Sequence, residues 1–183
     1  MRSWSKFSGQ LTDKRNLRQS NAAFSLIELM VVVTILSLLF LIAVPTYQRL
    51  QRKARTAAIV TDFRVYATAF QAHAHDTGTW PPESPAGVVP TGMTPEELKF
   101  DDWVHITPMG GKFDWENNQV HPGGTSPGGR WRAAITISPT SDAPIVNDAA
   151  LLLDIDRAID DGDLNAGSFR LGFGGNPLFV IEN

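Results

Sequence analysis

The chain has 183 residues and a slightly acidic balance, with 16 lysines and arginines, 19 aspartates and glutamates and a formal net charge of −3. This length allows one globular domain beside a membrane anchor. Beyond residue 23, 11 basic residues stand against 18 acidic ones. That balance argues against a nucleic-acid binder, which would show a basic patch. The absence of cysteine excludes a fold held by disulfides.

The first 23 residues differ in charge from the rest of the chain. They carry five basic residues and one acidic residue, a net charge of +4. By the positive-inside rule such a segment stays on the cytoplasmic side of a membrane. The segment shows no apolar periodicity, so we interpret residues 1–23 as a leader peptide outside the fold. A retained cytoplasmic tail is the alternative.

Residues 24–44 form an apolar run of 21 residues with a single charged side chain, Glu28. A helix of about 20 apolar residues crosses the hydrocarbon core of a bilayer. Thr34 and Ser37 cost little there, because their hydroxyls can return a hydrogen bond to the helix backbone. An ionised carboxylate near lipid costs roughly 2.5 kcal/mol or more unless it has a partner. Glu28 therefore needs a specific partner.

The position of the small residues suggests that partner. An ordinary secretory signal is cleaved at small residues that follow its apolar region, whereas Ala22 and Ala23 precede the apolar run. Cleavage after Ala23 would make Phe24 the N-terminus, with Glu28 about one helical turn away. The free amine and the carboxylate could then neutralise each other, within one chain or between neighbours.

These residues carry a family resemblance. Residues 23–28 read Ala-Phe-Ser-Leu-Ile-Glu, and with the apolar run and Pro45 they resemble the prepilin signal of type IV pilins and type II secretion pseudopilins. The resemblance implies that a membrane peptidase cleaves between Ala23 and Phe24 and methylates the new amine. It also implies that Glu28 pairs with the amine of an adjacent subunit, and that Pro45 kinks the helix. Ala23 stands where the family usually has Gly.

The helix is expected to continue beyond the apolar run, because residues 46–75 contain no Gly or Pro. Apolar side chains recur there at three- and four-residue steps, which is the amphipathic helical pattern; they include Ile59, Phe63, Tyr66 and Phe70. We therefore predict one helix over residues 24–76, about 80 Å long, with Gly78 as a left-handed cap. Its outer half needs a partner surface.

Four basic residues follow the apolar run, where lipid phosphates could meet them: Arg49, Arg52, Lys53 and Arg55. Further on, residues 76–81 read Asp-Thr-Gly-Thr-Trp-Pro. This resembles the Asp-x-Gly-x-Tyr-Pro segment that follows the long helix of major pseudopilins, with Trp in place of Tyr.

The rest of the chain, residues 77–183, predicts one globular domain. Its pattern is a loop with a short helix beginning near Thr94, then a small antiparallel sheet interrupted by a helix. The strands are expected at 112–116, 131–138, 168–173 and 178–181, and the helix at 148–160. The predicted fold class is α+β, in which the sheet covers the outer half of a long, membrane-anchored N-terminal helix, as in pilins.

One cluster of polar residues suggests a metal. Asp160, Asp161, Asp163 and Asn165 surround a glycine turn and offer the oxygen ligands that calcium prefers. The resemblance adds that some major pseudopilins bind calcium in a C-terminal loop. The spacing is not that of an EF-hand, however, and an Asp-Gly turn at a helix end needs no ion. Both interpretations stay open.

Motifs for catalysis are weak. The four histidines lack the spacing of zinc ligands, and neither a Gly-x-Ser-x-Gly motif nor a phosphate-binding loop occurs. We therefore expect no enzyme.

The predicted function is that of a structural filament subunit. By resemblance it polymerises through its N-terminal helix and works with a prepilin peptidase, an inner-membrane assembly platform and minor pseudopilins. It would be a single-pass inner-membrane protein with residues 77–183 outside the cytoplasm. The lack of cysteine and the 76–81 segment favour a type II secretion pseudopilin. A true type IV pilin, a membrane-anchored binding module that does not polymerise and an anchored enzyme are the alternatives.

Overall fold

The computed structural model describes residues 24–121, 130–146 and 148–183. The leader predicted for residues 1–23 lies outside the described residues. The chain divides into two compact units, Met1–Ala43 and Val44–Asn183, and each is described by itself.

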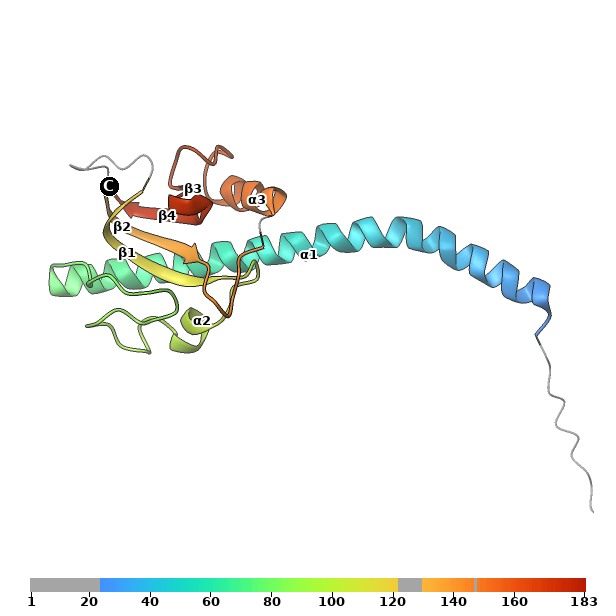
Figure 1. The fold of residues 1–183 in the computed structure, drawn as a ribbon, viewed down its shortest axis with the longest axis horizontal. Coiled ribbons are helices and arrows are strands. Elements are labelled where there is room, and N and C mark those ends of the chain that lie inside the picture. The colour runs from blue at the N-terminus through green and yellow to red at the C-terminus, as the bar shows by residue number, and fades with distance from the viewer. Residues whose placement is uncertain (1–23, 122–129, 147) are drawn as a thin grey trace, which may run out of the picture. The chain divides into compact units, whose positions relative to one another are not determined.

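One helix, α1 (Leu26–Thr77), runs for 52 residues (Figure 1). Two of its hydroxyls return to the backbone as predicted, since Thr34 donates to the Met30 carbonyl at 2.6 Å and Ser37 to the Val33 carbonyl at 2.7 Å. Pro45 lies inside α1 and does not end it, and the expected kink stays a prediction. The helix ends at Gly78, whose φ of 78° confirms the left-handed cap.

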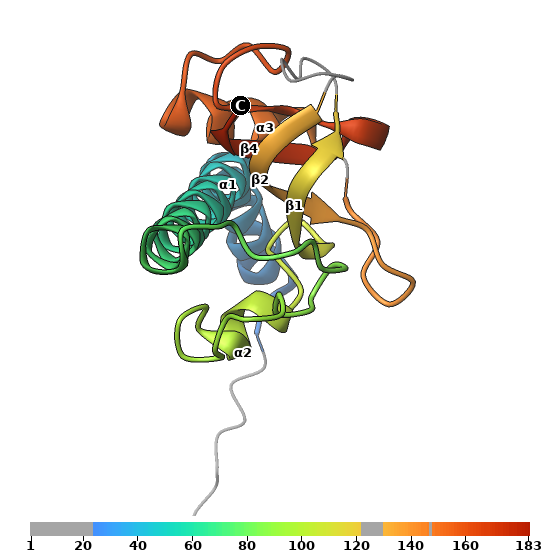
Figure 2. The ribbon, with the colours of Figure 1, turned by 90° about the vertical axis from the view of Figure 1, so that its left-hand side faces the viewer.

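The second unit contains a four-stranded antiparallel sheet with the strand order β1-β2-β4-β3 (Figure 2). The strands are β1 (Lys112–Val120), β2 (Arg130–Ser138), β3 (Phe169–Leu171) and β4 (Pro177–Glu182). Three short helical elements complete the unit: α2 (Phe100–Val104), α3 (Ala149–Ile159) and a 3-10 turn, η1 (Phe173–Gly175). The α+β fold class predicted from the sequence is confirmed.

The core of this unit lies between the outer half of α1 and the sheet. The predicted stripe of α1 is fully buried, including Phe63 and Phe70. The Phe70 ring stacks on Trp115 of β1 with centroids 3.7 Å apart, and Phe63 meets Phe113 edge-on at 5.5 Å. Trp115 also donates its indole N–H to the Pro81 carbonyl at 3.0 Å. Such aromatic contacts add to the free energy of burial and fix the strand register.

Three local predictions were wrong in detail. β1 continues past residue 116 to Val120, because its polar end still pairs with β2 and lies on an edge strand, where polar side chains are tolerated. Alternation along residues 131–138 predicts that Trp131 shares a face with Ala133 and Ile135. It packs instead with Ala134 and Leu178, outside the main core, because the register between β2 and β4 shifts next to Ala134 and a bulge reorients side chains.

The third concerns the helix expected at Thr94. There Thr94 and Glu97 make a reciprocal capping pair, in which the Glu97 carboxylate accepts the Thr94 N–H at 2.5 Å. Only a turn follows, because Lys99 adopts a left-handed conformation with φ 49°. Regular helix begins after it, as α2.

Candidate functional site

The N-terminal part of α1 exposes an unbroken apolar surface. Every residue from 24 to 51 is exposed, and the large apolar side chains range from Leu26 at 85 % to Leu36 at 47 %. An 18-residue window of α1 has a mean hydropathy of 2.8, so by length and composition α1 is able to cross a membrane. Soluble monomers rarely expose an apolar patch of this extent, so this surface requires lipid or other apolar helices around it.

Glu28 lies at the start of this surface. Its Oε2 accepts the backbone N–H of Ser25 at 2.9 Å, so the carboxylate reaches back to the first turn of α1. A carboxylate in that position also faces the positive end of the helix dipole. Glu28 therefore has a local structural role that the sequence interpretation missed, although a glutamate three residues into a helix is a known capping signal.

Phe24 and Ala23 are the residues predicted for cleavage and methylation. Phe24 is 81 % exposed, and it lines one shallow hollow together with Glu28 and Val31. The structure thus brings Phe24 and Glu28 together. Ala23, the residue before the predicted cleavage point, lies outside the described residues.

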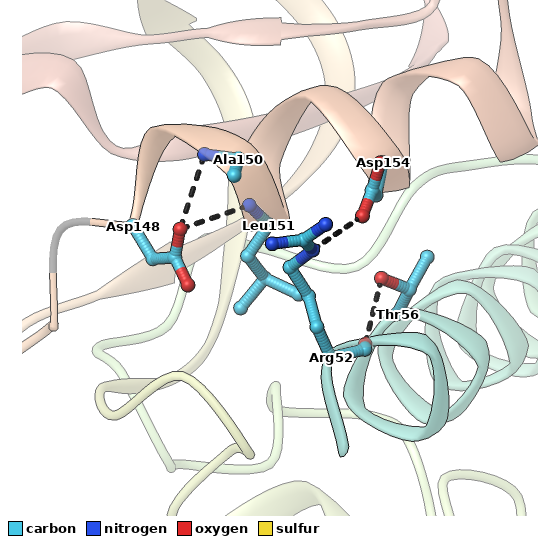
Figure 3. A network of polar contacts seen from close by, with 6 residues as sticks. All are labelled: Arg52, Thr56, Asp148, Ala150, Leu151 and Asp154. Carbon is cyan, nitrogen blue, oxygen red and sulfur yellow. Dashed lines mark hydrogen bonds and ion pairs between the residues drawn. The ribbon is translucent and has the colours of Figure 1, made fainter. Parts of the chain in front are cut away.

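A second group of charged residues fastens α3 to the outer half of α1. Arg52 of α1 forms an ion pair with Asp154 of α3 at 2.7 Å, and Asp148 caps α3 by accepting the N–H groups of Ala150 and Leu151 at 3.1 Å each (Figure 3). Further along, Arg64 donates to the Ala158 carbonyl at 2.9 Å. These contacts fix the helix that precedes the acidic loop.

The acidic loop holds the four residues predicted as calcium ligands. Its carboxylates accept hydrogen bonds from backbone N–H groups. Asp160 accepts the Ser168 N–H, and Asp161 accepts the Asp163 N–H at 2.8 Å. Asp163 accepts both the backbone and the side-chain N–H of Asn165 at 3.0 Å, and these bonds lower the pKa of Asp163. Within the described ranges, no three His, Cys, Asp or Glu side chains are grouped to hold a metal. The four residues share one loop, and calcium binding by them stays a prediction.

Asp156 belongs to the same acidic cluster of the sequence, and its burial is the feature of this region that sequence reasoning missed. It is fully buried, and both of its carboxylate oxygens lie without a hydrogen-bond partner in the described part of the chain. Burial raises its pKa, and the negative charge of Asp161 raises it further. The available signal was its spacing, because Asp156 falls four residues after the buried Leu152 on α3.

Comparison with known proteins finds a match at the N-terminal stretch that includes Phe24 and Glu28. Residues 18–44 match the family model described as the prokaryotic N-terminal methylation motif. The resemblance to a prepilin-type signal is thereby confirmed over those residues, which include Phe24 and Glu28. No curated protein matches the chain significantly.

Among solved structures, the chain resembles the major type IV pilin PilA1 from Clostridium difficile. The identity is 16 % and the TM-score 0.43, over 72 % of this chain and 97 % of that one.

Proposed function

We propose that this chain is a structural subunit of a type II secretion pseudopilus or a related type IV pilus-like filament. In this proposal a prepilin peptidase cleaves before Phe24 and methylates the new amine, and the subunit then polymerises through α1. One observation carries it. The methylation motif over residues 18–44 coincides with the stretch of α1 whose apolar side chains are all exposed.

The physical reason for polymerisation lies in that stretch. Its apolar surface is covered by lipid before assembly and by neighbouring helices afterwards, so little apolar area changes its contact with water. Helix association in such surroundings depends on close packing and on polar pairs. Glu28 is the one ionisable side chain from residue 24 to residue 44. Paired with the amine of a neighbour, it would set the axial offset between subunits, because any other offset leaves a carboxylate unpaired in a medium of low dielectric constant.

The same proposal assigns a location and partners. The basic leader stays in the cytoplasm, α1 anchors the chain in the inner membrane, and residues 77–183 lie on the other side. The partners are further copies of this chain, a prepilin peptidase, an inner-membrane assembly platform and minor pseudopilins. The role is structural and involves no catalysis and no nucleic acid. A true pilus is the second form of the same proposal.

A membrane-anchored binding module is the competing function, and one feature favours it. An open groove of about 660 Å³ lies between the end of α1 and the strands β1, β2 and β4, lined by residues that include Trp80, Arg132 and Glu182. These three side chains already satisfy one another, since Glu182 accepts the Trp80 indole N–H at 2.5 Å and pairs with Arg132 at 2.7 Å. A ligand in the groove would therefore have to compete with these contacts.

The experiment that tests the proposal is N-terminal sequencing of the protein extracted from membranes that contain a prepilin peptidase. We expect the sequence to begin at Phe24 with a methylated amine. Ala23→Gly should be processed at least as well, whereas Ala23→Leu should accumulate uncleaved, because the larger side chain stands next to the scissile bond. A mature protein that begins at Met1, or beyond Ala43, would leave Glu28 without an amine and would exclude the filament function.

A further inference from the structure

The charge on this chain is divided sharply between one stretch of α1 and everything after it. Residues 44–64 carry five basic residues and one acidic residue, a net charge of +4. Residues 65–183 carry six basic and 16 acidic residues, a net charge of −10. Four of the cations lie within seven residues of one another, and we name them the basic collar: Arg49, Arg52, Lys53 and Arg55.

Most of the basic collar is unused by the fold. Arg49, Lys53 and Arg55 are exposed, and none of the three forms an ion pair with a carboxylate among the described residues. Arg52 is the exception, because Asp154 holds it (Figure 3). Three cations are therefore presented to the surroundings.

The position of the collar on α1 determines what those surroundings are. Arg49 follows Val44, the last residue of the apolar run, by five residues, which is about 7.5 Å along a helix axis. The polar headgroup layer of a bilayer is about 5–8 Å thick on each side. Helical side chains lean toward the N-terminus, and long basic side chains extend their charge toward the interface. The cations of the collar thus lean back toward the end of the apolar run.

We infer that the basic collar binds the phosphate groups of anionic phospholipids at the membrane surface from which residues 45–183 emerge. This inference rests on the membrane anchoring that is part of the proposed function. Basic residues on the translocated side oppose the orientation that the positive-inside rule favours, and contact with anionic headgroups compensates for that charge.

A second copy of this chain, with its acidic domain, is the other partner that the charge would suit. The lipid is favoured because the collar and the apolar run belong to the same helix, so anchoring alone brings the collar to the headgroups. Before assembly, no such constraint brings the acidic residues of another copy to it.

The test uses the full chain reconstituted in vesicles and spin-labelled phosphatidylglycerol and phosphatidylcholine as probes. Flotation of the vesicles first reports whether the protein is anchored. We then expect the protein to retain phosphatidylglycerol about fivefold or more over phosphatidylcholine, with the preference falling as salt is raised.

The triple variant R49Q/K53Q/R55Q should lose most of that preference. The matched variant K99Q/R130Q/R132Q, which also removes three positive charges, should keep it, and so should R49K/R55K. The leader is common to all variants and cancels in these comparisons.

The outcomes separate this inference from the proposed function. Flotation without lipid preference, or a preference unchanged in the triple variant, overturns the lipid site and leaves the filament proposal intact. An unchanged preference together with loss of crosslinks between copies would assign the collar to a second copy instead. Failure to float would overturn the anchoring, and with it both proposals.

Discussion

The two halves of α1 have the same backbone conformation and opposite environments. From residue 26 to residue 44 every side chain is exposed and nearly all are apolar, on every side of the helix. From Thr56 to Phe70 the apolar side chains recur at three- and four-residue steps, and seven residues are buried against the rest of the chain. An amphipathic helix is covered by its own domain, whereas a helix that is apolar all round needs a surrounding that the chain does not supply.

Changing Glu28 tests the half that needs an external partner, and we expect the largest effect there. Glu28→Leu should leave membrane insertion intact and abolish incorporation into filaments, because the register between subunits loses its only charged pair. Glu28→Asp should be intermediate, since its charge remains but its reach is one methylene shorter. The measurement is co-expression with the assembly machinery, followed by shearing and by crosslinking between helix positions of adjacent subunits. Ordered crosslinked ladders of the Leu variant would contradict the mechanism.

A pair of phenylalanines in the same helix sharpens the comparison. Phe63 is fully buried and Phe40 is 64 % exposed. Phe63→Ala should lower the free energy of unfolding of the unit Val44–Asn183 by about 3–5 kcal/mol, because it opens a cavity between α1 and the sheet. Phe40→Ala should leave that free energy unchanged. Denaturant unfolding of detergent-solubilised protein, followed by tryptophan fluorescence, measures both. Equal losses in the two variants would mean that the two halves are not energetically separate.

The stability of the unit Val44–Asn183 should also depend on pH. Burial raises the pKa of Asp114 on β1 to about 7, although a hydrogen bond from Ser138 opposes the shift. The folded state therefore keeps a proton that the unfolded chain releases above about pH 4. The free energy of unfolding should therefore fall as pH rises from about 4 to about 7. The expected loss is about 1–2 kcal/mol after allowance for the partial exposure of the Asp114 side chain.

Asp114→Asn should remove that slope, so the variant should gain stability over the wild type at pH 7.5 and match it near pH 4. Asp76→Asn, at an exposed carboxylate, serves as the control and should keep the slope. Thermal unfolding at a series of pH values measures this slope for the wild type and for both variants. A slope that persists in Asp114→Asn would assign it to another group.

The smallest effect is expected from calcium. Because Asp160, Asp161 and Asp163 cap backbone N–H groups of their own loop, we expect chelator and excess calcium to leave the melting temperature of the protein unchanged. An ion that binds only the folded state would raise it by mass action. A melting temperature that falls with chelator, and that no longer responds in Asp161→Asn, would establish the calcium loop instead.

Much of this molecule follows from local pattern. The apolar run, the stripe through Phe63 and Phe70, the cap at Gly78 and the antiparallel strands could be predicted, because helical and strand periodicity and glycine conformation are properties of neighbouring residues. The methylation motif is likewise a contiguous stretch, so Phe24 and Glu28 could be found without coordinates.

Other features depend on residues that are distant in the sequence. Arg52 meets Asp154 across 102 positions, Asp156 is buried only because α3 packs where it does, and Trp131 leaves the main core because of a register shift between β2 and β4. The strand order β1-β2-β4-β3 is of the same kind. Each of these features depends on which two surfaces pack together. The free energy of such a contact is set by both surfaces, so it cannot be predicted from either segment alone.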